Sequence, residues 1–154
     1  MNQTLTPPKT STASGRTPLE VLRLYYGAMQ AKSADDLAEL YAADAIHEFS
    51  FFTPNGPSRL EGQEAVRSRY GHVWRNHPLT IDSIEDLFMY QATDPEVVIA
   101  QWRARATLNT SGKAVEITGL LVLRVRDGFI VHTRDFMDAL GITNALGRPP
   151  FTPE

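Results

Sequence analysis

Two carboxylates near the end of the chain, Asp135 and Asp138, are the first candidates for acid/base chemistry. They lie in the stretch HTRDFMDALG, residues 132–141, which begins with the alternation of a β-strand. One side of this strand carries Val131, Thr133, Asp135 and Met137, and because it is the more apolar side we expect it to face inward. Burial disfavours the charged form of a carboxyl group and raises its pKa, so the group can exchange protons near neutral pH. Asp135 is therefore our candidate general acid/base.

His47 is the expected partner of Asp135. The stretch AIHEFSFF, residues 45–52, alternates as a strand with His47, Phe49 and Phe51 on one side. A histidine beside a buried acid can tune or relay its proton. Each residue also has a purely structural interpretation. Asp135 would then be a hydrogen-bonded or exposed carboxylate at a strand end, and His47 a hydrogen-bonded core histidine.

Composition excludes several other kinds of chemistry. The chain has 154 residues and no cysteine, which excludes disulfides, thiol nucleophiles and cysteine metal sites. His72 and His77 are five residues apart, a poor spacing for metal ligands on a helix, so we expect no metal and no cofactor. The net charge of −3 and the lack of a long apolar run favour neither nucleic acid nor a membrane. Without a secretory signal, a cytoplasmic location is expected.

Secondary-structure elements must position these residues, and we expect mostly helices in the first part of the chain and strands in the second. Start signals at Thr17, Ser33 and Gly62 precede three segments with helical spacing of apolar residues. Four long strands are then expected at 79–91, 97–109, 114–126 and 129–138. This order is typical of a single α+β domain. We assign 1–17 to a disordered tail, 18–145 to the domain and 146–154 to a Pro-rich tail.

A curved sheet that faces helices encloses space, which side chains fill or a ligand occupies. In 97–109 the apolar side carries Trp102, Ala104 and Ala106, and the alanines leave room. Gly119 on the next strand would leave more. We expect a ligand cavity here. The alternative is a sheet whose small residues accommodate large side chains from the helices.

Three stretches carry a resemblance to a known superfamily: LYYGAMQAKSADDLAELYAADAIHEF, LEGQEAVRSRY and DGFIVHTRDFMDALG. Together they resemble the SnoaL-like and ketosteroid-isomerase-like superfamily, which shares the fold of nuclear transport factor. Within it, the pattern is closest to the phenazine-biosynthesis A/B-like proteins. The resemblance implies an α+β fold, a cone-shaped barrel of a strongly curved mixed, mostly antiparallel sheet packed against three N-terminal helices. It also implies a homodimer that forms through the sheet.

The resemblance assigns roles to individual residues. The oxyanion tyrosine of ketosteroid isomerase falls on Tyr25, and other cavity tyrosines fall on Tyr41 and Tyr70. The two acids of that enzyme fall on Phe49 and near Leu121, so its own machinery for steroid isomerisation is missing. In SnoaL-type cyclases an aspartate in the last strand acts as acid/base, a role that implies Asp135 or, as the second choice, Asp138 here.

These observations predict a cofactor-free acid/base enzyme of the isomerase, cyclase or dehydratase type. Its substrate would be a small hydrophobic carbonyl or cyclic compound bound in the cone. The expected catalytic residues are Asp135, His47 and Tyr25. The expected substrate-binding residues are Phe49, Tyr41, Tyr70, Trp102, Leu121, Thr133, Met137 and Asp138. The alternative is a non-catalytic small-molecule-binding or dimeric interaction module of the same fold.

Overall fold

The computed structural model describes residues 15–51 and 56–147. The three expected helices form, each beginning at its start signal, and two strands lie between the second helix and the third. The helices are α1 (Pro18–Ala31), α2 (Ala34–Ala38) and α3 (Gln63–Arg75). At the start of α1, the Thr17 side chain accepts from the backbone N–H of Glu20 at 3.2 Å, and the Thr17 N–H donates to Glu20 Oε2 at 2.7 Å. This reciprocal pair satisfies two backbone donors that a helix start leaves without partners.

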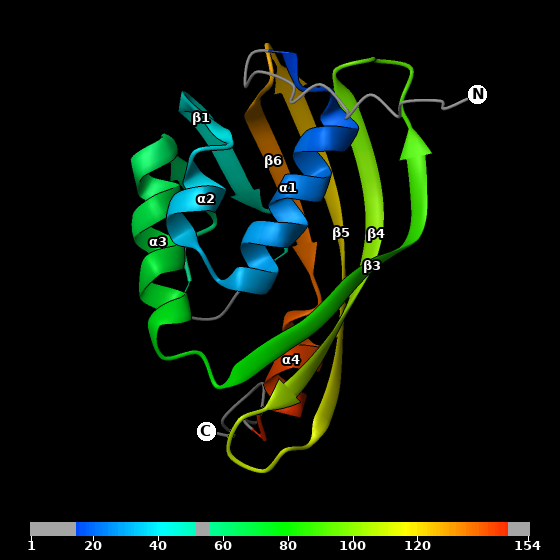
Figure 1. Ribbon diagram of the computed structural model, residues 1–154. Helices are drawn as coiled ribbons and strands as arrows, with labels where there is room; N and C mark the ends of the chain where they lie inside the picture. The colour runs from blue at the N-terminus through cyan, green and yellow to red at the C-terminus, as the bar shows by residue number, and fades with distance from the viewer. Residues whose placement is uncertain (1–14, 52–55, 148–154) are drawn as a thin grey trace, which may run out of the picture.

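The strands form one mixed sheet with the order β2-β1-β6-β5-β4-β3 (Figure 1). Their bounds are β1 (Tyr41–Phe49), β2 (Arg59–Glu61), β3 (Leu79–Gln91), β4 (Val97–Leu108), β5 (Ala114–Arg126) and β6 (Phe129–Met137). Only β1 and β6 pair in parallel; the other neighbours within the described ranges are antiparallel. The long strands curve strongly, but the sheet stays open, with β2 and β3 at its edges. The expected mixed, mostly antiparallel sheet is confirmed, and the barrel is not closed.

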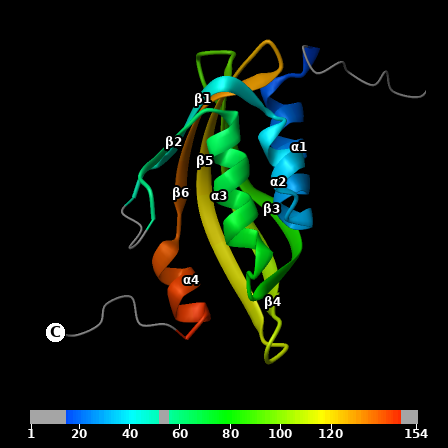
Figure 2. The same cartoon turned by 90° about the vertical axis from the view of Figure 1, so that its left-hand side faces the viewer.

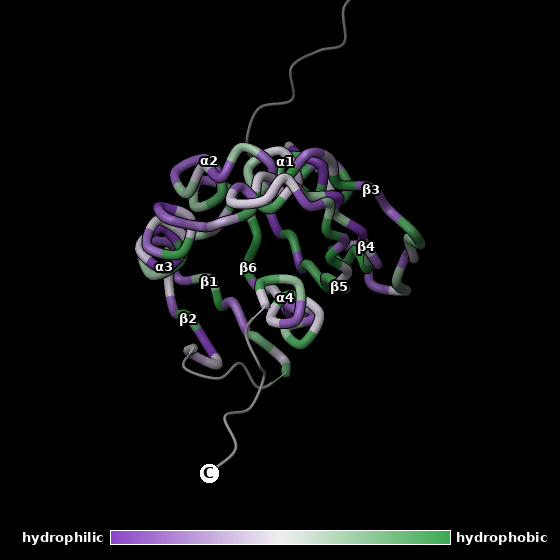
Figure 3. The backbone as a smooth tube through the Cα atoms, turned by 90° about the horizontal axis from the view of Figure 1, so that it is seen from below, coloured by the Kyte–Doolittle hydropathy of each residue, from purple (hydrophilic) through white to green (hydrophobic). Residues whose placement is uncertain are grey.

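The helices and the sheet enclose the core between them. Seen from the side, α1 and α2 lie on one side of β5 and β6, and α4 (Ala139–Ala145) lies on the other (Figure 2). From below, α1, α2 and α3 form an arc along the inner side of the strands (Figure 3). We call the side that these three helices cover the inner face of the sheet, and the opposite side the outer face. Trp102, Ala104 and Ala106 are buried on the inner face, as the alternation in β4 predicts.

Three local predictions need correction. The first strand runs from Tyr41 to Phe49, four residues earlier at its start than the expected 45–52. The short strand β2 was not expected. In β6 the prediction that Val131 faces inward is wrong: Ile130 is fully buried and Val131 is half-buried. A bulge explains this, because His132 pairs with Arg124 while Ile130 pairs with Val125, so the alternation restarts after one extra residue.

Most of the two expected tails, 1–17 and 146–154, lies outside the described residues. Thr17 itself caps α1, and Leu146 caps the end of α4. No helix in the described part of the chain is long and apolar enough to cross a membrane.

Candidate active site

Asp135 lies in β6 at the centre of the inner face. Its neighbours across the sheet are Phe49 in β1 and Leu121 in β5. The side chain is 4% exposed, so the expectation that it points inward is confirmed. Its Oδ2 atom lies 3.7 Å from His47 Nε2. Its Oδ1 atom is buried and has no hydrogen-bond partner among the described residues.

His47 reaches Asp135 through the parallel pairing of β1 and β6, which places it beside Thr133. The imidazole is fully buried, and its Nδ1 atom is 2.8 Å from the Tyr41 hydroxyl. That hydroxyl is also 3.0 Å from Thr133 Oγ1. If Thr133 donates to Tyr41 and Tyr41 donates to Nδ1, then His47 carries its proton on Nε2, the nitrogen that faces Asp135. We assign this tautomer because it satisfies every polar atom in the chain from Thr133 to His47.

Three buried tyrosines surround this pair. The Tyr70 hydroxyl is 3.4 Å from His47 Nε2, and the Tyr25 phenol interacts with the hydroxyls of both Tyr41 and Tyr70. Burial raises the pKa of each of the three phenols above the ordinary value, and the nearby charge of Asp135 raises each pKa further. All three hydroxyls therefore keep their protons at physiological pH. They can act as hydrogen-bond donors, and they are unsuited to act as bases.

Apolar side chains complete the surroundings of Asp135. The Phe49 ring lies 4.6 Å from the His47 ring, and Leu121 is buried beside Asp135. Trp102 is 2% exposed and lies across Gly119, because a Cβ atom on that glycine would be only 2.6 Å from the indole ring. The room that the sequence predicted at Gly119 is thus filled by the indole. Its Nε1 atom is buried without a hydrogen-bond partner in the described part of the chain.

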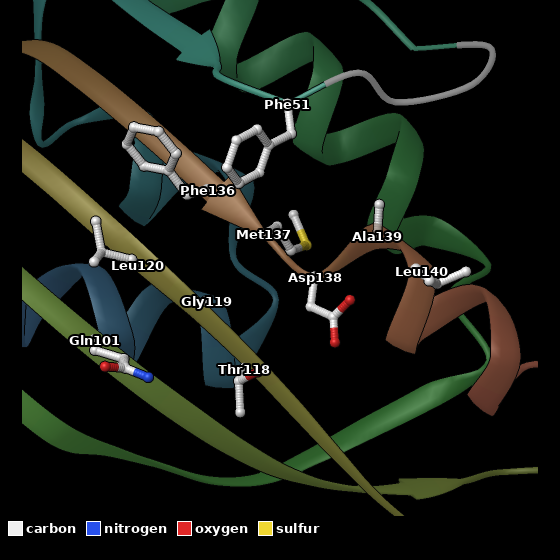
Figure 4. A pocket seen from close by; sticks show the side chains of 10 residues that line it. All are labelled: Phe51, Gln101, Thr118, Gly119, Leu120, Phe136, Met137, Asp138, Ala139 and Leu140. Atoms are coloured by element: carbon white, nitrogen blue, oxygen red, sulfur yellow. The ribbon is translucent and has the colours of Figure 1, made fainter.

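Two predicted binding residues lie apart from this cluster. Asp138 is exposed and begins α4, where its side chain accepts from the Gly141 N–H at 2.8 Å. Met137 is half-buried, and both residues line a groove of about 700 Å³ beside α4 (Figure 4). Gln101, Leu120 and Phe136, neighbours across three strands, also line this groove. These three belong to the outer face, where the sequence did not predict a groove.

Two hollows on the surface lie apart from Asp135, His47 and Tyr25. Besides the groove beside α4, a second hollow of about 720 Å³ lies between α1 and α2. Asp135, His47 and Tyr25 line neither of them. These three side chains are at most 4% exposed, so little of the cluster is open to solvent. Within 15–51 and 56–147 no three His, Asp or Glu side chains are grouped so as to hold a metal ion.

The chain is similar to several known proteins. A family model described as a SnoaL-like domain matches residues 22–133. An uncharacterised protein of Pseudomonas aeruginosa, named as PhzA/B-like, is 29% identical over 109 residues, which cover 71% of this chain and 75% of that protein. An isomerase candidate from Bacillus subtilis has a crystal structure that superposes with a TM-score of 0.72 at 26% identity, over 84% of this chain and 92% of that one.

A crystal structure of a candidate polyketide cyclase from Pseudomonas putida is also similar. It superposes with a TM-score of 0.65 at 15% identity, over 84% of this chain and 98% of that one. At this identity the likeness concerns the fold.

Proposed function

Because the chain belongs to the SnoaL-like domain family, we propose that it is a cofactor-free acid/base enzyme of the isomerase, cyclase or dehydratase type. The substrate would be a small hydrophobic carbonyl or cyclic compound. The names of similar proteins, an isomerase candidate and a candidate polyketide cyclase, fit an enzyme of this kind. The fold alone does not assign a reaction, so the proposal rests on the site.

The observation that carries the proposal is the unpartnered Oδ1 atom of Asp135. Buried polar atoms almost always have hydrogen-bond partners, and an exception calls for a cause such as a catalytic role. Here the exception is a carboxylate oxygen held among phenols and an imidazole, the kinds of group that general acid/base catalysis uses. A lone pair that no protein group uses is free to accept a proton from a substrate.

The proposed step is a proton transfer next to a carbonyl group. Asp135 Oδ1 takes a proton from a carbon adjacent to the carbonyl, the electron pair of that C–H bond forms a double bond to the carbonyl carbon, and the π pair of the C=O bond moves onto the oxygen. Tyr25, which stays protonated, donates a hydrogen bond to the resulting oxyanion. If the substrate carries a C=C bond next to the carbon that lost its proton, Asp135 returns the proton to the far carbon of that C=C bond while the oxyanion re-forms the C=O bond, so the double bond shifts and the enzyme is unchanged. His47, whose Nε2 lies 3.7 Å from Asp135 Oδ2, would position the carboxylate or relay its proton.

The rival proposal is a non-catalytic binding module. The burial of the cluster favours it, because Asp135 lines neither of the two surface hollows described above. The convergence of Asp135, His47 and Tyr25 on one spot favours the enzyme, because a ligand carrier does not require these groups to meet. Homodimerisation through the outer face is compatible with both proposals and stays a prediction.

The experiment is exchange of α-protons in D₂O, followed by proton NMR, with a panel of cyclic ketones such as 2-tetralone. Wild-type protein should accelerate exchange, and Asp135→Asn should lower the rate by about 100- to 10,000-fold, the usual contribution of a general acid/base. Asp44→Asn, the same change at an exposed aspartate of β1, is the matched control and should keep the wild-type rate. Exchange that survives in Asp135→Asn contradicts the proposal. A wild-type protein that binds the ketones without exchanging their protons supports the binding module.

A further inference from the structure

Two buried polar atoms on the inner face lack partners among the described residues, and they are chemically complementary to one ligand. One is the acceptor Oδ1 of Asp135 and the other is the donor Nε1–H of Trp102. Both side chains are more than nine-tenths buried, at 4% and 2% exposure. The residues that flank Trp102 on the inner side of β4, Ala100 and Ala104, have no polar side-chain atoms to offer it.

The sheet register places Trp102 Nε1 one strand away from the strand of Asp135. Trp102 pairs with Gly119 in β5, and Gly119 pairs with Met137 in β6, two residues beyond Asp135. The indole lies across Gly119, with Nε1 3.1 Å from the position that a Cβ atom would occupy. Nε1 is therefore over β5, one strand away from β6. One strand spacing of about 4.8 Å and two residues of about 3.4 Å each separate it from the Cα of Asp135 by about 8 Å.

The chemistry of the two atoms defines the ligand. An indole N–H can only donate, so it requires an acceptor such as a carbonyl, ether or hydroxyl oxygen. The remaining polar groups of the cluster already have partners: Tyr41 contacts His47 and Thr133, and Tyr70 contacts His47. Tyr25, which interacts with Tyr41 and Tyr70, is already assigned to the oxyanion at the near end of the ligand. The donor of Trp102, which has no partner in the described ranges, can therefore recognise the far end of a ligand whose near end contacts Asp135.

We propose that Trp102 Nε1 binds a second oxygen atom of the substrate, at the end remote from the carbon whose proton Asp135 takes. The substrate class is then a bicyclic or similarly long carbonyl compound with an acceptor oxygen at both ends. This inference rests on the proposed function for the role of Asp135. Trp102 is, in this view, a residue that determines specificity through direct contact with the substrate.

The test compares two probes, 2-tetralone and 6-methoxy-2-tetralone, which differ in an ether oxygen at the end of the bicycle opposite to the ketone. Protein labelled with ¹⁵N at its two tryptophans, Trp74 and Trp102, gives two indole N–H signals, and Trp102→Phe identifies one by its loss. The methoxy probe should move the Trp102 indole proton downfield, and 2-tetralone should not. The Trp74 signal is the internal reference. One hydrogen bond should make the methoxy probe bind about 3- to 10-fold more tightly than 2-tetralone.

Two variants remove the preference in different ways. Trp102→Phe keeps an aromatic ring and loses the donor, so both probes should bind with equal affinity. Gly119→Ala keeps the donor but places a Cβ atom 2.6 Å from the indole carbon, so it should displace the ring and weaken binding of the methoxy probe in particular. If Trp102→Phe does not fold, the wild-type titration and the alanine variant still decide the question.

The outcomes separate this inference from the proposed function. If 2-tetralone exchanges its α-protons but neither probe shifts the Trp102 indole signal, the Trp102 site is refuted and the acid/base function stands. If the Trp102 signal moves with the methoxy probe while neither probe exchanges protons, the binding site stands and the acid/base function is refuted. Equal affinities of both probes for wild-type protein, with an unmoved indole signal, refute the Trp102 site.

Discussion

Replacing Asp135 with asparagine should stabilise the protein while it abolishes proton exchange. The side chain is 4% exposed and its Oδ1 atom has no partner in the described ranges, while Oδ2 is 3.7 Å from His47 Nε2, beyond ordinary hydrogen-bond length. An unsatisfied buried polar group costs about 1–3 kcal/mol, and a charged one costs more. Asparagine keeps the shape and removes the charge; its amide still lacks a partner at the Oδ1 position, so the gain is the excess penalty of a charged buried group over a neutral one. We therefore expect the free energy of unfolding at pH 8 to rise by about 1–3 kcal/mol.

Thermal and urea denaturation, followed by circular dichroism, measure this change. In a domain of this size each kcal/mol shifts the Tm by about 2–4 °C, so the increase is easily resolved. Asp44→Asn, at an exposed position, should change the free energy of unfolding by less than about 0.5 kcal/mol. A less stable Asp135→Asn variant would refute the reasoning. It would mean that Asp135 forms a stabilising ion pair with a protonated His47, and is a structural residue.

Two further predictions concern the ionisation of the three buried tyrosines and of Glu48. Burial raises the pKa of Tyr25, Tyr41 and Tyr70, so their tyrosinate absorbance near 295 nm should be missing at pH 10–11 in the folded protein. Because the three phenols ionise at about pH 10 in the unfolded chain, the free energy of unfolding should fall as the pH rises above that value. Ionisation of the three phenols at pH 10–11 in the folded protein would contradict their burial. The hydrogen bond from His132 lowers the pKa of Glu48. The contribution of ionised Glu48 to the free energy of unfolding is therefore present above the unfolded pKa of about 4.3 and is lost as the pH falls through the folded pKa. Glu48→Gln should therefore lower the free energy of unfolding by about 0.2–1 kcal/mol at pH 7, and an equal difference in strong acid would refute this origin.

The elements that could be predicted from the sequence are those whose ends carry a local conformational requirement. Asp127 and Gly128 both have a positive φ, 52° and 81°, as a two-residue hairpin turn of this hand requires. That pair delimits β5 and β6 to within one residue. The strand β2 has three residues, Arg59–Glu61, too few to show an alternation. The bulge at Val131 was missed because counting alternate residues assumes a continuous ladder.

Some features of the candidate site could be predicted from the sequence and others could not. The inward orientation of Asp135 and His47 could be predicted, because each follows from the alternation within its own strand. The contact of the Trp102 indole with Gly119 could not be predicted, because it depends on the register between β4 and β5, which the sequence of one strand does not determine. The useful signal would have been a large aromatic residue opposite a glycine on the neighbouring strand. Asp138 was placed in the site because the resemblance assigns a role to an aspartate of the last strand, whereas β6 ends at Met137 and Asp138 begins α4.

The position of β6 in the sheet has a consequence for synthesis of the protein. The last strand in the chain, Phe129–Met137, lies between β1 and β5, and it alone joins β1 and β2 to the other strands. A chain still emerging from the ribosome therefore holds two separate sets of strands, each with an unpaired apolar edge where the final strand will insert. Such long-range pairing is slow to form, and exposed edges promote aggregation. Because Asp135 arrives with that strand, the reactive cluster is assembled by the same event that completes the sheet.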